Sequence, residues 1–177
     1  MKKTIIVYKS NYGSSEKYAK WIAEETNADI FKLKDIKMGI LESYDTICYC
    51  AGVYASIING FSKIKKIFDK ISNKKIIVVA VGSAPNSNST KKSLKKSNFT
   101  DKIKDKINFF VVRGGINYEK MNFIYKFIMF IVVQLAKSKK NLNEEAKGII
   151  ASYGKNIDFS NKDDIKPIVE LIKSDSM

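Results

Sequence analysis

The sequence contains no histidine and only two cysteines among its 177 residues. Zinc and copper sites are usually built from imidazole and thiolate ligands, so the sequence predicts no metal site of these kinds. Cys48 and Cys50 lie two positions apart in a segment with the pattern of a buried strand. Residues so close in an extended backbone cannot form a disulfide. We therefore expect both cysteines to be small core residues that face the same side of a sheet.

Arginine is nearly absent, because Arg113 is the only one, although Lys and Arg together number 32 against 18 Asp and Glu. The resulting net charge of +14 favours phosphates, anionic lipid or an acidic partner. A codon bias toward A and T would produce the same richness in Lys, Ile and Asn. Guanidinium groups are preferred for contacts to phosphates and bases, so their scarcity argues against nucleic acid as a partner.

Long hydrophobic runs are also lacking. Every residue from Phe127 to Val133 is apolar, but this run is far shorter than the ~20 residues that span a bilayer. The opening residues Met1–Val7 carry two lysines and a short apolar run, which is not the pattern of a secretory signal. We expect a cytoplasmic protein, and the length favours a single domain over residues 1–177.

The sequence does contain an alternation of short apolar runs with helical patterns, which predicts an α/β fold with a parallel sheet. The predicted strands are Thr4–Tyr8, Asp29–Leu33, Thr46–Ala51, Lys75–Gly82 and Ile107–Val112. The predicted helices are Ser14–Thr26, Phe61–Ile71, Leu94–Ile103, Tyr118–Lys137, Asn143–Ser152 and Asn161–Ile172, the last one capped by Ser160 with Asp163. We expect a doubly wound sheet of order 2-1-3-4-5 with helices on both faces.

The loop after the first strand has the composition of a phosphate site, with the residues Ser10, Asn11, Tyr12, Gly13, Ser14 and Ser15. A loop that leads from a strand into a helix presents free backbone amides and the positive end of the helix dipole. The loop lacks both the dinucleotide glycine pattern and the Walker lysine, so a monophosphate such as that of FMN fits it best. The alternative is an ordinary Ser/Gly turn with Ser14 as the helix cap.

This loop, together with the segments that follow the third, fourth and fifth strands, resembles the flavodoxin family. The resemblance implies one non-covalently bound FMN and assigns no catalytic side chain. It implies contacts to the cofactor from Ser10, Asn11, Tyr12, Gly13, Ser14, Ser15, Ala51, Gly52, Val53, Tyr54, Ser83, Ala84, Pro85, Asn86, Gly114, Gly115 and Tyr118.

Particular roles follow for some of these residues. The Gly52 carbonyl is the candidate to turn toward the flavin's central-ring nitrogen, because glycine adopts either peptide orientation readily. Tyr54 or Tyr118 would stack on the ring. Pro85 and Asn86 would line one side of the flavin ring.

Within that family, the order of the motifs is most similar to the bacterial menaquinone-dependent protoporphyrinogen oxidases, which implies a quinone as the electron acceptor. This sequence departs from that pattern, because Arg113 alone is available for tetrapyrrole carboxylates. Two alternatives remain. One is a soluble, low-potential electron carrier that serves a redox partner protein. The other is a flavin-free binding module that docks on an anionic polymer through Lys91–Lys106.

The apolar stretch over residues 123–137 is the last unusual feature. Helical spacing puts Lys126, Phe130, Val133 and Lys137 on one stripe. The lysines indicate that this face is exposed to solvent, yet it also carries a large aromatic residue. This mixture favours a peripheral contact with the inner membrane face, a quinone or a partner. The alternative is a helix that covers the sheet or forms a homo-oligomer interface.

Overall fold

A computed structural model describes residues 2–138, 150 and 153–174. Five strands form a parallel sheet in the order β2-β1-β3-β5-β6. The short strand β4 pairs antiparallel with the last residues of β3. The strands are β1 Thr4–Lys9, β2 Asp29–Lys32, β3 Thr46–Tyr54, β4 Ile57–Ile58, β5 Lys75–Gly82 and β6 Ile107–Arg113. Counted along the chain without β4, the order of the parallel strands is 2-1-3-4-5, so the predicted α/β fold and its topology are confirmed.

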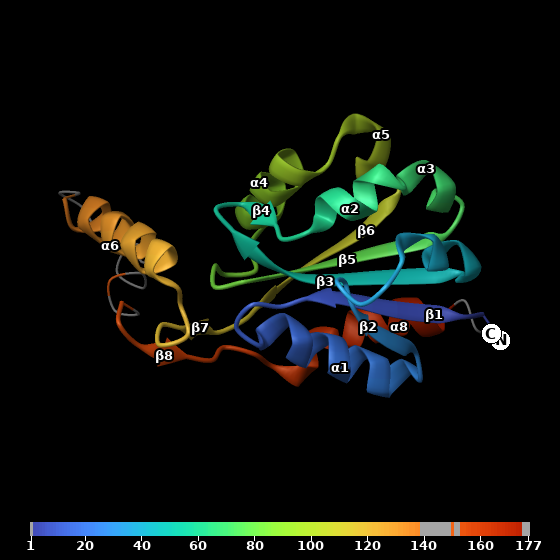
Figure 1. Cartoon of the computed structure of the whole chain (residues 1–177), viewed down its shortest axis with the longest axis horizontal. Coiled ribbons are helices and arrows are strands. Elements are labelled where there is room, and N and C mark those ends of the chain that lie inside the picture. The colour runs from blue at the N-terminus through green and yellow to red at the C-terminus, as the bar shows by residue number, and fades with distance from the viewer. Residues whose placement is uncertain (1, 139–149, 151–152, 175–177) are drawn as a thin grey trace.

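Two layers of helices cover the sheet, one on each face (Figure 1). One layer consists of α1 Ser14–Thr26, the 3₁₀ helix η2 Lys162–Ile165 and α8 Lys166–Lys173. The other consists of the 3₁₀ helix η1 Met38–Ser43, α2 Phe61–Lys66, α3 Phe68–Ile71, α4 Asn88–Asn98 and α5 Asp101–Lys104.

Alternation along the strands supplies both cores, since successive side chains point to opposite faces. Ile5 and Val7 pack in one core and Ile6 in the other. Cys48 and Cys50 are both buried in the core beneath α1, which confirms that they face the same side.

The strand β3 continues three residues beyond its predicted end at Ala51 and turns directly into β4. Tyr54 lies opposite Ile57 and Val53 lies opposite Ile58 in this antiparallel hairpin. The prediction that residues 52–54 form a loop was therefore wrong. The turn at Ala55–Ser56 contains neither glycine nor asparagine, so the usual hairpin signal is missing from the sequence.

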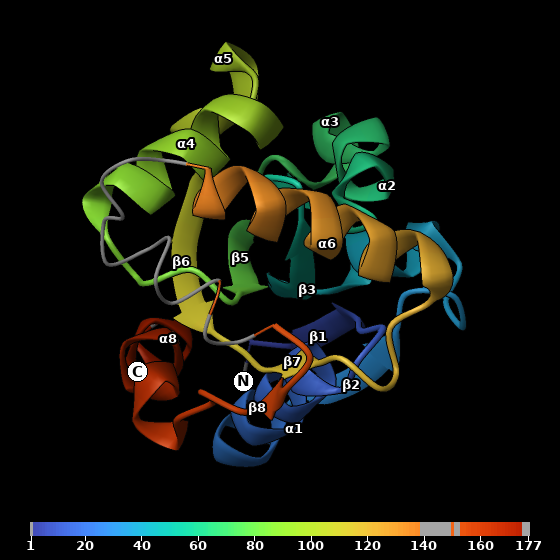
Figure 2. The ribbon, with the colours of Figure 1, turned by 90° about the vertical axis from the view of Figure 1, so that its left-hand side faces the viewer.

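The carboxyl ends of the strands are covered by a separate group of elements. Helix α6 Phe123–Lys137 crosses in front of these ends, and the short strands β7 Ile116–Asn117 and β8 Asn156–Ile157 pair antiparallel beside it (Figures 1 and 2). Val133 is buried whereas Phe130 is exposed, so the predicted stripe of Lys126, Phe130, Val133 and Lys137 is not a single solvent-exposed face.

Two helices in the middle of the chain differ from their predicted bounds. The helix predicted over 61–71 is divided at Ile67, whose backbone leaves the helical region. The helix predicted over 94–103 begins earlier, at Asn88, because the Ser87 hydroxyl accepts a hydrogen bond from the Thr90 amide at 3.1 Å. It ends at Asn98, and α5 follows as a separate turn.

Two caps late in the chain also differ from prediction. Helix α6 begins at Phe123 rather than Tyr118, since the Asn122 side chain accepts a hydrogen bond from the Tyr125 amide at 3.0 Å. Asn161, not Ser160, caps the last helical segment by accepting from the Asp163 amide at 3.0 Å. The helix predicted over 143–152 lies outside the described residues, apart from position 150.

Candidate functional site

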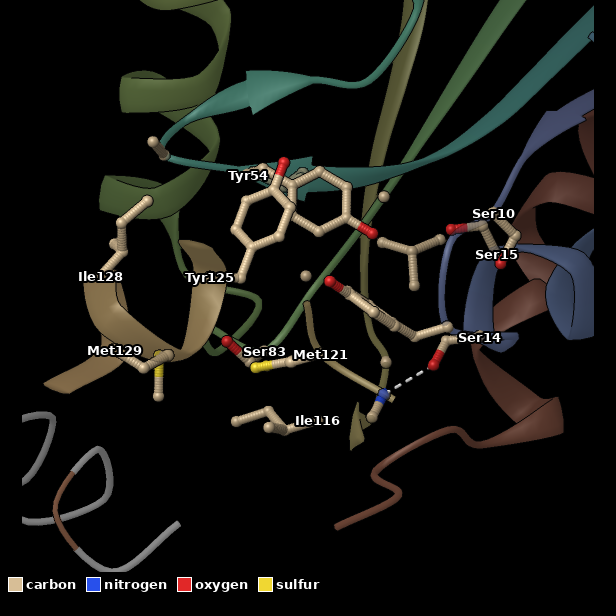
Figure 3. Close-up of a pocket in the computed structure, with 18 of the residues that line it drawn as sticks. Ser10, Ser14, Ser15, Tyr54, Ser83, Ile116, Met121, Tyr125, Ile128 and Met129 are labelled. Atoms are coloured by element: carbon tan, nitrogen blue, oxygen red, sulfur yellow. Dashed lines mark hydrogen bonds between the residues drawn. The ribbon is translucent and has the colours of Figure 1, made fainter. Parts of the chain in front are cut away.

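A cavity of about 380 Å³ lies at the carboxyl edge of the sheet, under α6 (Figure 3). This volume is in the range of small-molecule sites. Among the described residues, the lining includes no charged side chain and is mostly apolar. The residues that line it are Ser10, Tyr12, Ser14, Ser15, Gly52, Val53, Tyr54, Ala55, Val81, Gly82, Ser83, Gly114, Gly115, Ile116, Met121, Tyr125, Ile128, Met129 and Val132.

One end of the cavity is formed by the loop between β1 and α1. The Ser10 hydroxyl accepts a hydrogen bond from the Gly13 amide at 3.0 Å, and Gly13 has a φ of +102°, which favours glycine. The first turn of α1 leaves the amides of Ser14, Ser15 and Glu16 without an intrahelical carbonyl. These amides, together with the positive end of the helix dipole, are the kind of donor set that favours an anion.

Ser14 joins this loop to the segment after β6. Its hydroxyl oxygen accepts a hydrogen bond from the Gly115 amide at 2.9 Å (Figure 3), and Gly13 rather than Ser14 occupies the cap position. A Cβ atom at Gly114 would lie 2.6 Å from the Val81 side chain and 2.9 Å from the Cβ of Ser14. Glycine at 114 therefore allows the loop after β6 to pack against the start of α1.

The other end of the cavity contains three tyrosines. The ring of Tyr54 lies 5.4 Å from that of Tyr125 and 6.0 Å from that of Tyr12, and the rings of Tyr12 and Tyr125 are 6.5 Å apart. Burial raises the pKa of both Tyr12 and Tyr54 above the ordinary value, so these phenols stay neutral at physiological pH. The cluster therefore presents neutral aromatic surface.

Tyr54 is carried by the β3–β4 hairpin, whose turn is conformationally strained. Ala55 and Ser56 have φ values of 46° and 64°, in the left-handed region that disfavours residues with a Cβ. The Gly52 carbonyl accepts a hydrogen bond from the Asn59 amide at 2.9 Å. In this conformation that carbonyl is engaged within the hairpin, so turning it toward a ligand would require breaking this bond.

The side chain of Asn98 on α4 holds this hairpin in place through hydrogen bonds. Its side-chain oxygen accepts from the Ile58 amide at 2.8 Å, and its amide group donates to the carbonyls of Ser56 and Leu94 at 2.8 and 2.9 Å. The residue is only 4% exposed. Sequence analysis missed it, because an asparagine at a helix end gives no signal for a long-range contact.

Several predicted site residues line the cavity and others lie outside it. Ten of the predicted residues are brought together: Ser10, Tyr12, Ser14, Ser15, Gly52, Val53, Tyr54, Ser83, Gly114 and Gly115. Gly13 lines a neighbouring cavity of about 350 Å³, together with Lys17 and Asp158, whose side chains form an ion pair at 2.9 Å.

The remaining predicted residues point elsewhere for local reasons. Asn11 accepts from the Asn59 side chain at 3.4 Å, and Ala51 is buried in β3. Ala84, Pro85 and Asn86 are not among the lining residues, since the loop turns into α4 with the Pro85 carbonyl accepting from the Ser87 amide. The Tyr118 ring packs against Tyr153 with their centroids 5.4 Å apart.

Helix α6 supplies a wall of the cavity that sequence analysis did not assign. Tyr125, Ile128, Met129 and Val132 line the cavity, and their spacing of three, four and seven residues puts them on one helical face. That spacing was the available signal, although nothing local in the sequence says that α6 returns over the strand ends. Ala55, Val81, Ile116 and Met121 were also missed, whereas Gly82 begins the segment after the fourth predicted strand that was expected near the ligand.

The sequence profile of the flavodoxin domain matches residues 5–143, which is most of the chain. The chain belongs to the flavodoxin domain family. The matched range includes the five parallel strands from Ile5 onward, the β1–α1 loop and helix α6.

Individual proteins are similar to this flavodoxin domain to different degrees. An uncharacterized protein of Methanocaldococcus jannaschii is 36% identical over 107 residues, which cover 59% of this chain and 67% of that protein. The two-electron reduced flavodoxin of Megasphaera elsdenii aligns with a TM-score of 0.43 and 16% identity over 62% of this chain and 85% of its own. A flavoprotein in complex with FMN from Lactobacillus acidophilus aligns with a TM-score of 0.40 and 19% identity over 64% of this chain and 93% of its own.

Other reactive groups in the described part of the flavodoxin domain give no second site. No cluster of three or more metal-ligating Cys, Asp or Glu side chains occurs among the described residues. Burial raises the pKa of the Cys48 thiol to about 12 and that of Cys50 well above its ordinary value, so neither is a nucleophile at neutral pH. No helix in the described ranges has both the length and the apolar character needed to cross a bilayer.

Proposed function

We propose that the cavity binds FMN and that this flavodoxin domain acts in electron transfer or as an FMN-dependent oxidoreductase. The observation that carries the proposal is the combination of a free helix amino end and a cluster of tyrosines in one cavity whose described lining has no charged side chain. FMN has a phosphate at one end and a planar ring at the other, so the residues present fit it. Membership in the flavodoxin domain family supports the same cofactor.

At the phosphate end, this chain would hold the anion with neutral donors. The amides of Ser14, Ser15 and Glu16 open α1, and the Ser10 hydroxyl already accepts from the Gly13 amide, which leaves its own hydrogen available to donate. Ser15 is buried at the same end. The helix dipole adds positive potential without a cationic side chain.

At the ring end, aromatic and apolar side chains would take up the flavin. Tyr54 and Tyr125 contact each other, and each presents a face on which a flavin would stack in place of that contact. Met121, Met129 and Val132 would cover the ring's apolar edge and exclude water. Bound flavin would supply the one- and two-electron chemistry, which the side chains of the cavity do not.

The charge distribution bears on the redox potential. No carboxylate occurs among the described residues that line the cavity, so none of these side chains would oppose the anionic reduced ring. We therefore expect a less negative potential for the second electron than in a flavodoxin whose ring is surrounded by acidic residues. A redox titration of the flavin-loaded protein measures this, and a strongly negative second couple would contradict it.

The experiment that tests cofactor binding compares FMN with riboflavin, which has the same ring but no phosphate. The purified protein should be yellow and keep its flavin through gel filtration. Calorimetry of the stripped protein should show tighter binding of FMN than of riboflavin. Protein that stays colourless and gives no heat with FMN would refute the proposal.

A variant of the phosphate loop sharpens this test. Ser10→Asp keeps an acceptor for the Gly13 amide but places a negative charge beside the phosphate. Two like charges about 4 Å apart repel by about 4 kcal/mol at an effective dielectric constant near 20. FMN affinity should therefore fall roughly a hundredfold or more, while riboflavin affinity changes little. Ser62→Asp adds the same charge to the exposed first turn of α2 and is the matched control.

A quinone is our proposal for the electron acceptor. The support is the apolar wall formed by Ile128, Met129 and Val132. This wall suits contact with an apolar quinone ring better than contact with the acidic surface of a partner protein. Tetrapyrrole oxidation has less support, because no cationic side chain is found among the described lining residues and the Arg113 guanidinium lies over the Phe159 ring at 4.0 Å. Oxidation of the reduced protein by menaquinone, with and without protoporphyrinogen as the donor, distinguishes the two reactions.

A further inference from the structure

Helix α6 leaves an unusual amount of apolar surface uncovered. Phe123, Ile124, Leu135 and Phe127 are 82%, 64%, 61% and 55% exposed. Among the residues of this helix only Val133 and Ala136 are buried. The helix stands clear of the two helical layers, at the end of the molecule where the strands terminate (Figures 1 and 2). None of these four exposed residues lines the cavity, so a ligand bound there would leave them uncovered.

The charges on and beside this surface are mostly positive. Between positions 120 and 138 the charged residues are Lys120, Lys126 and Lys137, and Glu119 directly precedes this range. The whole chain carries a net charge of +14. A second copy of the chain would bring the same lysines to the interface, where like charges repel. An anionic surface complements both the apolar side chains and the lysines.

The length of α6 decides how it could meet a bilayer. Fifteen residues at about 1.5 Å each give a helix of roughly 22 Å, which is shorter than the ~30 Å hydrocarbon core. A helix of this kind lies in the plane of the interface, with its aromatic and aliphatic residues among the acyl chains and its lysines among the headgroups.

We propose that α6 docks this protein on the surface of an anionic phospholipid bilayer. The docking face consists of Phe123, Ile124, Phe127 and Leu135, with Lys120, Lys126 and Lys137 as the contacts to lipid phosphates. Docking does not depend on the cofactor, because the exposed residues and the cavity residues are different side chains of the same helix. Where FMN is bound as proposed above, docking also brings the cavity wall of α6 next to the lipid phase.

Vesicle flotation of the full chain tests the proposal. Vesicles of phosphatidylcholine with phosphatidylglycerol supply an anionic surface, and vesicles of phosphatidylcholine alone supply a neutral one. We expect at least tenfold tighter binding to the anionic vesicles at low salt, and weaker binding in high salt. Measurements with and without added FMN should agree, so the docking result stands apart from any failure of flavin binding.

Two variants with matched controls identify the surface. Phe123→Ser with Phe127→Ser should weaken binding at least tenfold, whereas Ile40→Ser with Ile57→Ser, which also removes exposed apolar residues, should change it less than twofold. Glutamine at Lys120, Lys126 and Lys137 should reduce the preference for anionic vesicles. The same change in net charge at Lys92, Lys95 and Lys96 on α4 should reduce it much less.

Two results would overturn the proposal. One is the absence of binding to anionic vesicles, or binding that Phe123→Ser with Phe127→Ser leaves unchanged. The other is a concentration-dependent dimer that this double variant abolishes while vesicles are ignored, which would assign the face to a second copy of the chain. Circular dichroism of each variant confirms that the fold is retained.

Discussion

Replacement of Asn98 by alanine should destabilise the whole domain and the ring end of the cavity with it. The side chain accepts from the Ile58 amide and donates to the Ser56 and Leu94 carbonyls, all within 2.9 Å. Ile58 is 1% exposed, so its amide would lose its partner with no access to water. A buried donor left unsatisfied costs about 1–3 kcal/mol. Ser56 is exposed, and water can reach its carbonyl. Loss of the hydrogen bond to this carbonyl therefore adds less to the free-energy cost.

The expected total for Asn98→Ala is about 3 kcal/mol of unfolding free energy, including the small cavity left by the amide. In a domain of this size that corresponds to a fall in Tm of roughly 6–12 °C. Asn98→Asp should be at least as damaging, because it keeps the acceptor for Ile58 but loses both donated bonds and buries a charge.

Thermal and urea unfolding followed by circular dichroism measure these changes. Asn88→Ala is the matched control, since it makes the same substitution at an exposed position of α4. If Asn98→Ala unfolded within about 0.5 kcal/mol of Asn88→Ala, the hairpin would not depend on this side chain. The argument that α4 fixes the wall carrying Tyr54 would then be refuted.

Three further outcomes are expected. Gly114→Ala should lower the urea unfolding free energy by about 1–3 kcal/mol, because its Cβ would lie 2.6 Å from the stiff Val81 side chain, and an unchanged midpoint would contradict this contact. Ser56→Gly should raise the same free energy by about 1 kcal/mol, since it relieves a φ of 64°, and a loss of stability would show that the turn is not left-handed. At pH 8 a thiol reagent should label Cys48 and Cys50 only after unfolding, because burial raises the pKa of both thiols and keeps them protonated. Rapid labelling of the native protein would contradict their burial.

The features that sequence predicted well are set by local pattern. The five parallel strands follow from runs such as Lys75–Gly82, in which consecutive apolar residues serve both faces of the sheet. The placement of Gly13 and its serine neighbours between a strand and the start of a helix follows from the same local pattern. Neither inference required knowledge of what lies elsewhere in the chain.

The features that sequence missed depend on contacts between distant segments. The hairpin of β3 and β4 was missed because its turn is held by Asn98, some forty positions away, rather than by a glycine. The start of α6 was placed five residues too early, because Asn122 rather than a residue near Tyr118 caps the helix. Tyr125 was overlooked as a wall residue because nothing local in the sequence says that α6 returns over the strand ends.

The two aromatic walls of the cavity are therefore anchored very differently. The hairpin with Tyr54 continues the central strand β3 and is bonded to buried Asn98, whereas α6 with Tyr125 buries only Val133 and Ala136. Elements with little buried apolar surface open at low free-energy cost. A flavin ring that replaces the contact between Tyr54 and Tyr125 would thus displace α6 rather than the hairpin. Because the exposed apolar residues of α6 do not line the cavity, such a displacement would leave them uncovered, and vesicle binding should be the same with and without FMN.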